Sequence, residues 1–347
     1  MEAAGQRGVQ EVEIGAFLTC GGPILDVRSP AEFAQGHIPG ALNLPLFSDA
    51  ERAAVGTAYK HQGRRQAVQL GLMAVGPRLA AMATELQRLA VDGDLRIHCW
   101  RGGLRSRSVA WLANLQQLPV TLLAGGYKAY RRWALARVSE PWPLLVLGGR
   151  TGTGKTELLL ELERRGRAVV DLEGLANHRG SSFGGLGLGE QPSTEHFENR
   201  LALRLEQLRG QGPIWVEAES AQVGRCRIPA PFWQRMRAAP VVEIERPLET
   251  RVSQLVEVYG CQGQMPLRLA TERIARRLGP QRTAAALAAI DCGDWAGACR
   301  QMLDYYDRCY DHDLSSRDQP PLRRLQLGTA GLQAAAELLL GAVADHA

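Results

Sequence analysis

One cysteine, Cys99, opens a segment whose residue types suit the binding and transfer of a small anion. The run from Arg96 to Ser106 reads RIHCWRGGLRS, in which an apolar strand leads into the cysteine and a helical stretch follows it. A thiol attacks only as its thiolate, and the N-terminus of a helix favours negative charge. Gly102 and Gly103 let the backbone amides curl around one centre, and Arg105 can close the ring with a bidentate fork. The segment predicts a nucleophile in an anion-binding loop.

The loop that begins at Cys99 is therefore the first candidate site. A buried cysteine at a strand end beside a solvated arginine is the ordinary alternative, and the spacing Cys-x5-Arg in a His-Cys and Arg-Ser context argues against it. We take Cys99 and Arg105 as catalytic candidates. The other loop residues that we expect to surround the anion are Trp100, Gly102, Gly103 and Leu104.

A second anion-binding loop lies further along the chain, where residues 149–156 read GRTGTGKT. This is the Walker A pattern, in which backbone amides surround a polyphosphate, the lysine neutralises it and the threonine hydroxyl can reach Mg²⁺. A P-loop also binds diphosphates other than nucleotides, so the motif by itself leaves ATP open. The phosphate-binding candidates are Gly149, Gly152, Gly154, Lys155 and Thr156.

Polar residues near the second loop could complete its site. Glu217 and Glu219 end an apolar strand and could hold a metal ion through water or orient a nucleophile, and a solvated strand end is the alternative. The glycine-rich stretch 175–189 reads either as a binding loop or as a flexible connection. Its candidate ligands are His178, Arg179, Ser181 and Ser182.

An arginine-rich helical stretch, residues 268–282, is a candidate contact with RNA. Helical spacing places Arg273, Arg276 and Arg277 on one face, where they could meet phosphates. A solvated helix face is the alternative. The tyrosines downstream, which could stack on bases or belong to the core, are Tyr305, Tyr306 and Tyr310.

Composition describes a globular protein with a mild basic surplus. Of 347 residues, 45% are hydrophobic and 22% charged, and 41 Lys and Arg against 36 Asp and Glu give a net charge of +5. The length predicts two domains, and the surplus suits a polyanionic partner without requiring one. The seven cysteines contain no Cys-x-x-Cys pair, so we expect neither a disulfide framework nor a structural metal. We expect a cytoplasmic protein, since no stretch reads as an export signal or a membrane span.

The two loops need rigid elements to position them, and an α/β alternation supplies these. Short apolar strands alternate with helical stretches from Ile24 onward, until residues 140–143, which read EPWP, break the helical pattern. A second alternation begins at Leu144 with the strand before the P-loop. We predict an open-sheet domain over residues 10–137 and, over residues 141–347, a P-loop NTPase-like parallel α/β domain that ends in helices.

The first predicted domain resembles the rhodanese domain. Residues 25–33 read LDVRSPAEF, residues 36–41 read GHIPGA and residues 123–127 read LAGGY, like the opening strand and turn and the end of that domain. The His-Cys-x5-Arg-Ser signature also occurs in protein tyrosine phosphatases, but the other segments match rhodaneses better. Sulfur-transferring rhodaneses usually carry a loop one residue shorter. The resemblance therefore implies a loop wide enough for a tetrahedral oxyanion, either phosphate or an analogue such as selenophosphate.

The loop sequence CWRGG, the motif GGRTGTGKT and the run NHRGSSFG at residues 177–184 make nearly the whole chain similar to bacterial tRNA 2-selenouridine synthases. That family replaces the sulfur of wobble 2-thiouridine in tRNA with selenium from selenophosphate, and it transfers a geranyl group from geranyl diphosphate to that sulfur as an intermediate step. The resemblance implies a transferase that contacts the anticodon region and needs no redox cofactor. It also implies that Cys99 serves the selenium step with Arg101 and Arg105 holding selenophosphate, while Lys155 and Thr156 hold a diphosphate or a tRNA phosphate.

One segment departs from the family pattern. Family sequences read like WVEDESR where residues 215–221 read WVEAESA, so Ala218 and Ala221 stand in place of an aspartate and an arginine. If those side chains bind metal or phosphate, activity would be altered. Two other function classes remain open: a Cys-x5-Arg phosphatase with a nucleotide-binding regulatory domain, and a non-catalytic RNA-binding module.

Overall fold

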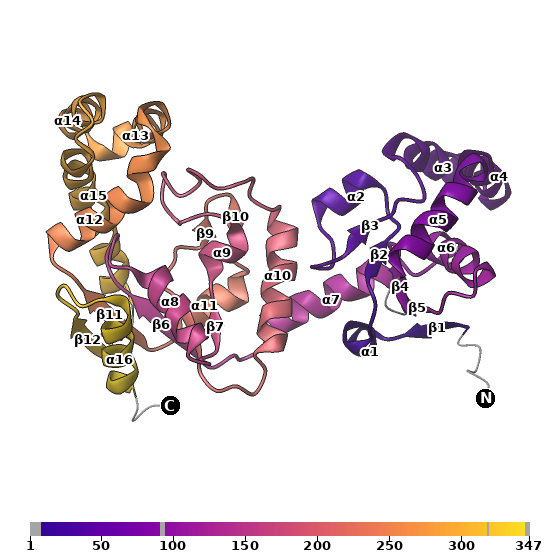
Figure 1. Cartoon of the computed structure of the whole chain (residues 1–347), viewed down its shortest axis with the longest axis horizontal. Helices are drawn as coiled ribbons and strands as arrows, with labels where there is room; N and C mark the ends of the chain where they lie inside the picture. Colours follow the sequence, from indigo (N-terminus) through magenta and orange to yellow (C-terminus); the bar gives the residue numbers. More distant parts are fainter. Residues whose placement is uncertain (1–7, 91–93, 318, 344–347) are drawn as a thin grey trace. The chain divides into compact units, whose positions relative to one another are not determined.

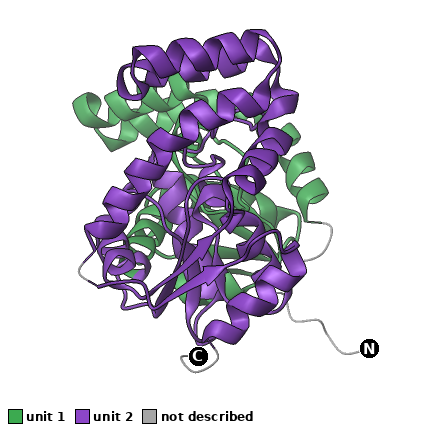
Figure 2. Cartoon of the chain, turned by 90° about the vertical axis from the view of Figure 1, so that its left-hand side faces the viewer, with its two compact units in different colours: residues 1–136 green, residues 137–347 purple. Residues whose placement is uncertain are grey.

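The computed structural model describes residues 8–90, 94–317 and 319–343, and the chain divides into two compact units, Met1–Ala136 (unit 1) and Arg137–Ala347 (unit 2), which are coloured separately in Figure 2. Each unit is built on a five-stranded parallel sheet with helices against it (Figure 1). The predicted α/β fold class is confirmed. Within the described ranges, no helix is long and apolar enough to cross a membrane.

The sheet of unit 1 has the strand order β1-β5-β4-β2-β3, so β4 is the central strand. Ile97 of β4 lies opposite Leu25 of β2 and Leu122 of β5, and all three side chains are buried. The strands are β1 (Val9–Val12), β2 (Ile24–Asp26), β3 (Leu42–Asn43), β4 (Leu95–His98) and β5 (Val120–Leu123). The helices are α1 (Ile14–Thr19), α2 (Pro30–Gln35), α3 (Asp49–Gln62), α4 (Arg64–Val75), α5 (Leu79–Leu89), α6 (Leu104–Leu115) and α7 (Gly126–Val138).

The sheet of unit 2 has the order β12-β11-β6-β8-β7, with β6 in the centre and an additional hairpin of β9 and β10. The strands are β6 (Leu144–Gly148), β7 (Val169–Val170), β8 (Ile214–Glu217), β9 (Gln222–Val223), β10 (Cys226–Arg227), β11 (Val241–Glu245) and β12 (Arg323–Gln326). The helices that accompany them are α8 (Lys155–Arg164), α9 (Leu172–Ala176), α10 (Thr194–Gln207), α11 (Ala230–Ala238) and α16 (Leu332–Val343). Because helices cover the sheet, residues 144–147 of β6 and residues 214–216 of β8 are continuous apolar runs rather than alternating ones.

Four helices between β11 and β12 form a layer with an apolar core of its own. They are α12 (Leu248–Tyr259), α13 (Gln264–Leu278), α14 (Pro280–Asp291) and α15 (Trp295–Ser315). Leu267, Ile274, Ile290 and Met302 meet in this core, together with Phe183 from the glycine-rich stretch. The helical layer therefore holds that stretch against unit 2.

In both units the anion-binding loop follows the central strand and precedes a helix. The carboxyl end of a central parallel strand is where ligands bind in open α/β sheets, because the neighbouring connections diverge there. The start of α7 packs directly against the first of these loops, the cysteine loop. Gly126 has φ of +60°, and a Cβ atom on it would lie 2.4 Å from both the Cys99 carbonyl oxygen and the Gly102 amide nitrogen.

Replacing Gly126 with alanine should therefore displace the cysteine loop. The left-handed backbone costs a non-glycine residue about 1–2 kcal/mol, and the backbone clash adds to that cost. We expect a lower unfolding temperature and loss of Cys99-dependent chemistry, measured by thermal denaturation and by activity. Gly40→Ala is the matched control, because Gly40 is also left-handed, with φ of +82°, but has open space around it. Equal effects of the two substitutions would show that the clash at the loop is unimportant.

Candidate functional sites

The cysteine loop presents backbone amides at the start of α6. Within the described residues, the amides of Trp100 to Arg105 donate to no protein acceptor. Cys99 is 3% exposed, and its Sγ lies 3.2 Å from Oγ of Ser106, a hydroxyl that can donate to a thiolate. Gly102 has φ of +66°, and a Cβ on it would lie 2.8 Å from the Leu123 carbonyl oxygen. The loop thus has the free donors that an anion requires, next to a nucleophilic sulfur.

Arg105 does not close this ring in the structure, because its guanidinium is paired with Glu32. Arg105 Nη1 lies 2.6 Å from Glu32 Oε2, and Arg52 is 3.7 Å from the other carboxylate oxygen. Burial raises the pKa of Glu32, but the hydrogen bond and charge of Arg105 outweigh it and leave the pKa lowered. Glu32 therefore occupies the guanidinium of Arg105, which an incoming oxyanion would otherwise bind.

The base of the cysteine loop is fixed by a buried polar cluster. Arg28 binds Asp26 through Nε and Nη2 at 2.9 and 2.6 Å, and its guanidinium lies 3.7 Å from the centroid of the Tyr127 ring. His98 is fully buried, its imidazole 3.8 Å from Asp26, and burial lowers its pKa. The histidine of the His-Cys pair is thus part of the core and supports the loop from behind.

The P-loop runs from β6 to α8 and presents donors in the same way. The amides of Gly152, Gly154, Lys155 and Thr156 have no protein acceptor among the described residues. Lys155 Nζ donates to the Gly149 carbonyl at 2.8 Å. A Cβ on Gly149 would lie 2.8 Å from the Ile244 carbonyl, so only glycine allows this close approach to β11.

Two arginines set the direction of these amides. Arg251 donates to the Thr151 carbonyl at 3.1 Å, and Arg246 donates to the Thr153 carbonyl at 3.1 Å. In a trans peptide the next amide points away from the carbonyl, so the amides that follow Thr151 and Thr153 face the opposite side. Arg251 is itself held by a bidentate pair with Asp307 of α15, at 2.7 Å for both bonds.

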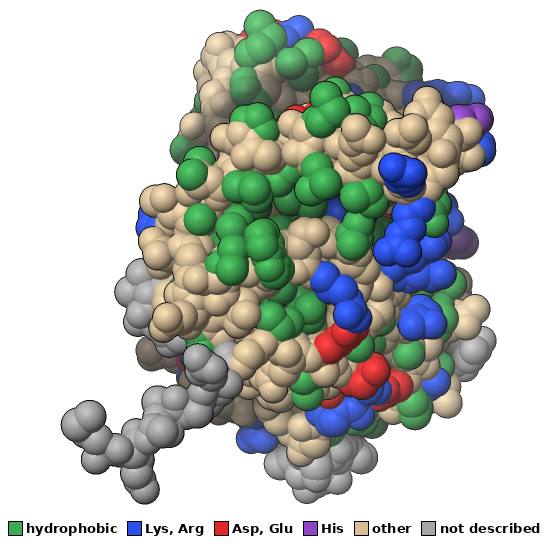
Figure 3. Space-filling model, turned by 90° about the vertical axis from the view of Figure 1, so that its right-hand side faces the viewer, with side chains coloured by type: hydrophobic (Ala, Val, Ile, Leu, Met, Phe, Trp, Pro, Cys, Tyr) green, Lys and Arg blue, Asp and Glu red, His purple; other side chains and the backbone are tan. Residues whose placement is uncertain are grey.

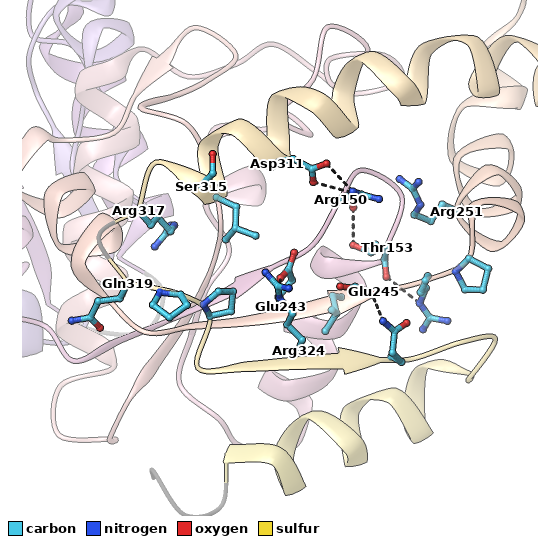
Figure 4. A pocket seen from close by; sticks show the side chains of 17 residues that line it. Arg150, Thr153, Glu243, Glu245, Arg251, Asp311, Ser315, Arg317, Gln319 and Arg324 are labelled. Atoms are coloured by element: carbon cyan, nitrogen blue, oxygen red, sulfur yellow. Dashed lines mark hydrogen bonds and ion pairs between the residues drawn. The ribbon is translucent and has the colours of Figure 1, made fainter.

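These arginines line a polar cavity of about 730 Å³, in which Arg150 lies between Asp311 and Thr153 (Figure 4). Every arginine that lines this cavity is paired with an acid or a carbonyl. The cavity therefore belongs to the scaffold that holds the P-loop.

The P-loop opens into a different cavity of about 350 Å³. Arg179, Gly180 and Ser181 of the glycine-rich stretch lie in its wall with Lys155 and Thr156. An apolar cavity of about 50 Å³ within the helical layer adjoins it and includes Phe183, Trp295 and Met302. The two cavities share Thr151, Ser181, Leu255, Tyr259 and Tyr306. The P-loop site thus combines N–H groups that can bind a phosphate with an apolar extension, the adjoining cavity of the helical layer.

Carboxyl groups gather beside Lys155 and Thr156. The Thr156 hydroxyl donates to Glu173 at 2.8 Å, and Glu173 in turn shares a hydrogen bond with Glu219. Burial raises the pKa of Glu219 to about 8, and the neighbouring Glu173 adds to this. Burial also raises the pKa of Glu173 and of Glu217. Glu219 therefore holds its proton at neutral pH unless a cation replaces it.

The structure brings some of the predicted residues to the P-loop cavity and places others elsewhere. Glu219, Arg179 and Ser181 line it. Glu217 is fully buried and accepts from the Glu173 amide at the start of α9, while Ser182 donates to the Ala270 carbonyl. His178 lies under the glycines at 184 and 185, and its pKa is lowered by burial and then by nearby arginines.

Sequence reasoning missed Glu173, Gln254 and Tyr259, which also line the cavity. They lie on α9 and α12, far from any recognisable motif, and only the fold brings them to the P-loop. Two of the tyrosines considered for base stacking, Tyr306 and Tyr310, are in the same wall. On α13, Arg273 donates to the Ser182 carbonyl at 3.1 Å, and Arg276 and Arg277 are exposed.

The comparisons with known proteins match both units. Residues 13–132 match the model of the rhodanese-like domain, and residues 142–328 match that of the tRNA 2-selenouridine synthase AAA domain. A tRNA 2-selenouridine synthase from Marinobacter nauticus is 36% identical over 332 residues, which cover 85% of this chain and 89% of that protein. The chain belongs to the tRNA 2-selenouridine synthase family. The predicted family resemblance is thus confirmed.

Other members of the tRNA 2-selenouridine synthase family are similarly close. The protein of that name from Bordetella petrii is 37% identical over 86% of this chain and 88% of its own length. The one from Pseudomonas fluorescens is 44% identical over 68% of this chain and 65% of its own length. Within this family fold, Ala218 lies in the P-loop cavity and Ala221 does not line it. A carboxylate at position 218 would add to the acidic group formed by Glu173 and Glu219.

Replacing Glu32 with glutamine should free Arg105 and tighten binding of a tetrahedral oxyanion at the cysteine loop. A partly exposed ion pair contributes about 1 kcal/mol, so we expect about fivefold tighter binding of inorganic phosphate, measured by isothermal titration calorimetry. Glu85→Gln is the control, since Glu85 forms a similar pair with Arg88 in α5. Unchanged phosphate affinity in the Glu32 variant would show that Glu32 does not compete with the oxyanion for Arg105.

The acidic group should make stability fall as pH rises. Folded Glu219 keeps its proton up to a pKa of about 8, whereas the unfolded residue ionises near pH 4.3. The folded state therefore binds more protons between these values, and the free energy of unfolding decreases by up to about 1.4 kcal/mol per pH unit for one group. Urea denaturation at a series of pH values should show a smaller slope for Glu219→Gln. Parallel curves for the two proteins would mean that Glu219 ionises normally.

Proposed function

We propose that the chain replaces the sulfur of wobble 2-thiouridine in tRNA with selenium from selenophosphate, through an S-geranylated intermediate made from geranyl diphosphate, in the cytoplasm. Membership of the tRNA 2-selenouridine synthase family supports the substrate and the product. The apolar extension of the P-loop cavity is the observation on which we assign geranyl transfer to the P-loop and the selenium step to the cysteine loop. The cysteine loop has a nucleophile, and the P-loop has a place for a diphosphate with an apolar chain.

Geranyl diphosphate is assigned to the P-loop on this ground. Lys155 and the free amides that follow Thr151 suit a diphosphate, and Leu255, Tyr259 and Tyr306 lead from it into the apolar cavity. That cavity is narrow, so part of the ten-carbon chain would lie along Leu255 and Tyr259.

The first step would alkylate the sulfur of the base. The thiocarbonyl sulfur attacks C1 of the geranyl group, the C1–O bond breaks, diphosphate departs and the N3 proton of the base is released. Lys155 and the P-loop amides stabilise the charge that develops on the departing diphosphate. Thr156 and Glu173, which already share a hydrogen bond, have the oxygen ligands that Mg²⁺ prefers together with substrate phosphates. Mg²⁺ held there would neutralise the diphosphate further.

The second step would take place at the cysteine loop. Alkylation converts a poor leaving group into a thiol, so selenium of selenophosphate can form the C2–Se bond while the C2–S bond breaks and geranylthiol departs. The departing sulfur takes the proton of selenophosphate. Water then cleaves the Se–P bond, which releases phosphate and returns a proton to N3 of the base. The amides of Trp100 to Arg105 would hold the selenophosphate oxygens, with Arg101 and, once released by Glu32, Arg105. Cys99 would serve this step.

Arginines on α13 are proposed to contact the tRNA backbone. Arg276 and Arg277 are exposed, and Arg273 contacts the glycine-rich stretch that lines the P-loop cavity. Other arginines of the same stretch are paired with acids, Arg268 with Asp291 and Arg282 with Asp304. The face that carries positions 273, 276 and 277 is therefore the one available to phosphates.

The function is tested by incubating the purified protein with 2-thiouridine tRNA, geranyl diphosphate and selenophosphate and weighing the nucleosides after digestion. We expect 2-selenouridine with both co-substrates and the S-geranylated nucleoside with geranyl diphosphate alone. The absence of any modified nucleoside, together with Cys99-dependent hydrolysis of an aryl phosphate, would instead establish a phosphatase.

A further inference from the structure

We propose that an apolar groove on unit 1, beside the cysteine loop, binds the hydrocarbon chain that the substrate base carries on its sulfur. The ligand class is a prenyl thioether attached to RNA, and the groove would hold the chain until the thiol departs. The proposal rests on the S-alkylated intermediate of the proposed function. It adds a second site for the hydrocarbon chain, apart from the cavity of the P-loop.

The groove lies among α3, α4, α5 and α6 and has a volume of about 720 Å³. Its walls are mainly apolar, and several of the side chains are unusually exposed: Tyr59 is 63%, Leu72 69% and Trp111 56% exposed. Contiguous apolar surface of this kind usually marks a binding site. Figure 3 shows hydrophobic side chains gathered on the side of unit 1 where α3, α4 and α6 lie in Figure 1.

The groove is continuous with the cysteine loop. Leu104 and Arg105, the last residues of the loop and the first of α6, also line the groove. Leu104 is 55% exposed, and Trp100 on the same loop is 37% exposed. A hydrocarbon chain in the groove would therefore end next to the anion-binding loop, where its sulfur must lie when selenium replaces it.

The charges around the groove favour a chain that is attached to a polyanion. Arg52, Arg64 and Arg105 line the groove, and no acidic residue does so among the described residues. Glu32, outside the lining, pairs with Arg105 and lies 3.7 Å from Arg52. Lys and Arg side chains, together with Asp and Glu side chains, stand beside the apolar surface in Figure 3. An apolar floor with arginines at its rim fits a hydrocarbon carried on RNA, since the chain would enter the groove while phosphates meet Arg64 and displace Glu32 from Arg105.

The size of the groove supports the same occupant. The apolar cavity next to the P-loop is about 50 Å³, whereas the groove of unit 1 is about 720 Å³. A free prenyl diphosphate can slide end-on into a narrow cavity. A chain attached to a bulky RNA must instead be laid down from the side, which requires an open groove.

Binding of defined RNAs to the full chain tests the proposal. The probes are an anticodon stem-loop with S-geranyl-2-thiouridine at the wobble position and the same RNA with S-methyl-2-thiouridine, and the readout is the ratio of their dissociation constants. Wild type should prefer the geranylated RNA by at least about tenfold, since each buried methylene adds affinity. Trp111→Ala and Leu72→Ala should each reduce this ratio severalfold, while affinity for the S-methyl RNA stays within about twofold.

Leu115→Ala is the matched control, because Leu115 lies one turn after Trp111 on α6, is 61% exposed and does not line the groove. It should keep the wild-type ratio, and thermal denaturation checks that each variant folds. A ratio near one in wild type, or an unchanged ratio in both groove variants, would overturn the proposal. So would a change in the oligomeric mass of the RNA-free Trp111 variant with no change in the ratio, because the groove would then be an interface between copies. Failure of the proposed function would appear separately, as absence of geranyl transfer in wild type.

Discussion

Both sites depend on one constraint: a set of backbone amides must face outward at the start of a helix, with no acceptor among the residues that the structure describes. Such amides are costly to bury and are stable only where an anion or water can reach them. The chain meets this constraint twice, after the central strand of each sheet, with glycine wherever a side chain would collide. Gly126 against the cysteine loop and Gly149 against β11 are two such positions. The rest of each unit positions these two loops.

The two units support their loops by different means. In unit 1 the support is a buried cluster in which Arg28, Asp26 and Tyr127 lie behind the cysteine. In unit 2 it is a pair of arginines that bind P-loop carbonyls, one of them anchored to Asp307 of α15. Because α15 also lines the apolar cavity, the helix that holds the phosphate loop also shapes the place for the hydrocarbon chain. A change in the position of α15 would therefore alter both the P-loop and the apolar cavity.

The motifs in the sequence were sufficient to predict the α/β class and both anion-binding loops, because these rest on local patterns of glycine, apolar runs and spacing. The sequence did not predict what the loops contact. Glu32 reaches Arg105 from α2, and Glu173 reaches Thr156 from α9, through pairings that only the sheet order creates. The acidic residue chosen from its position at a strand end, Glu217, caps a helix, whereas Glu219 two residues later lines the cavity. Strand β1 and the edge strand β12 carry exposed and polar residues, so an apolar pattern could not reveal them.

If the two loops serve successive steps, a substitution in one loop should block one step and leave the other intact. Lys155→Ala and Cys99→Ala variants would each be given either 2-thiouridine tRNA with geranyl diphosphate or ready-made S-geranylated tRNA with selenophosphate. We expect the Lys155 variant to fail to geranylate but still to convert geranylated tRNA to selenouridine, and the Cys99 variant to show the reverse. A Cys99 variant that cannot geranylate, or a Lys155 variant that cannot use geranylated tRNA, would contradict the assignment of one step to each loop.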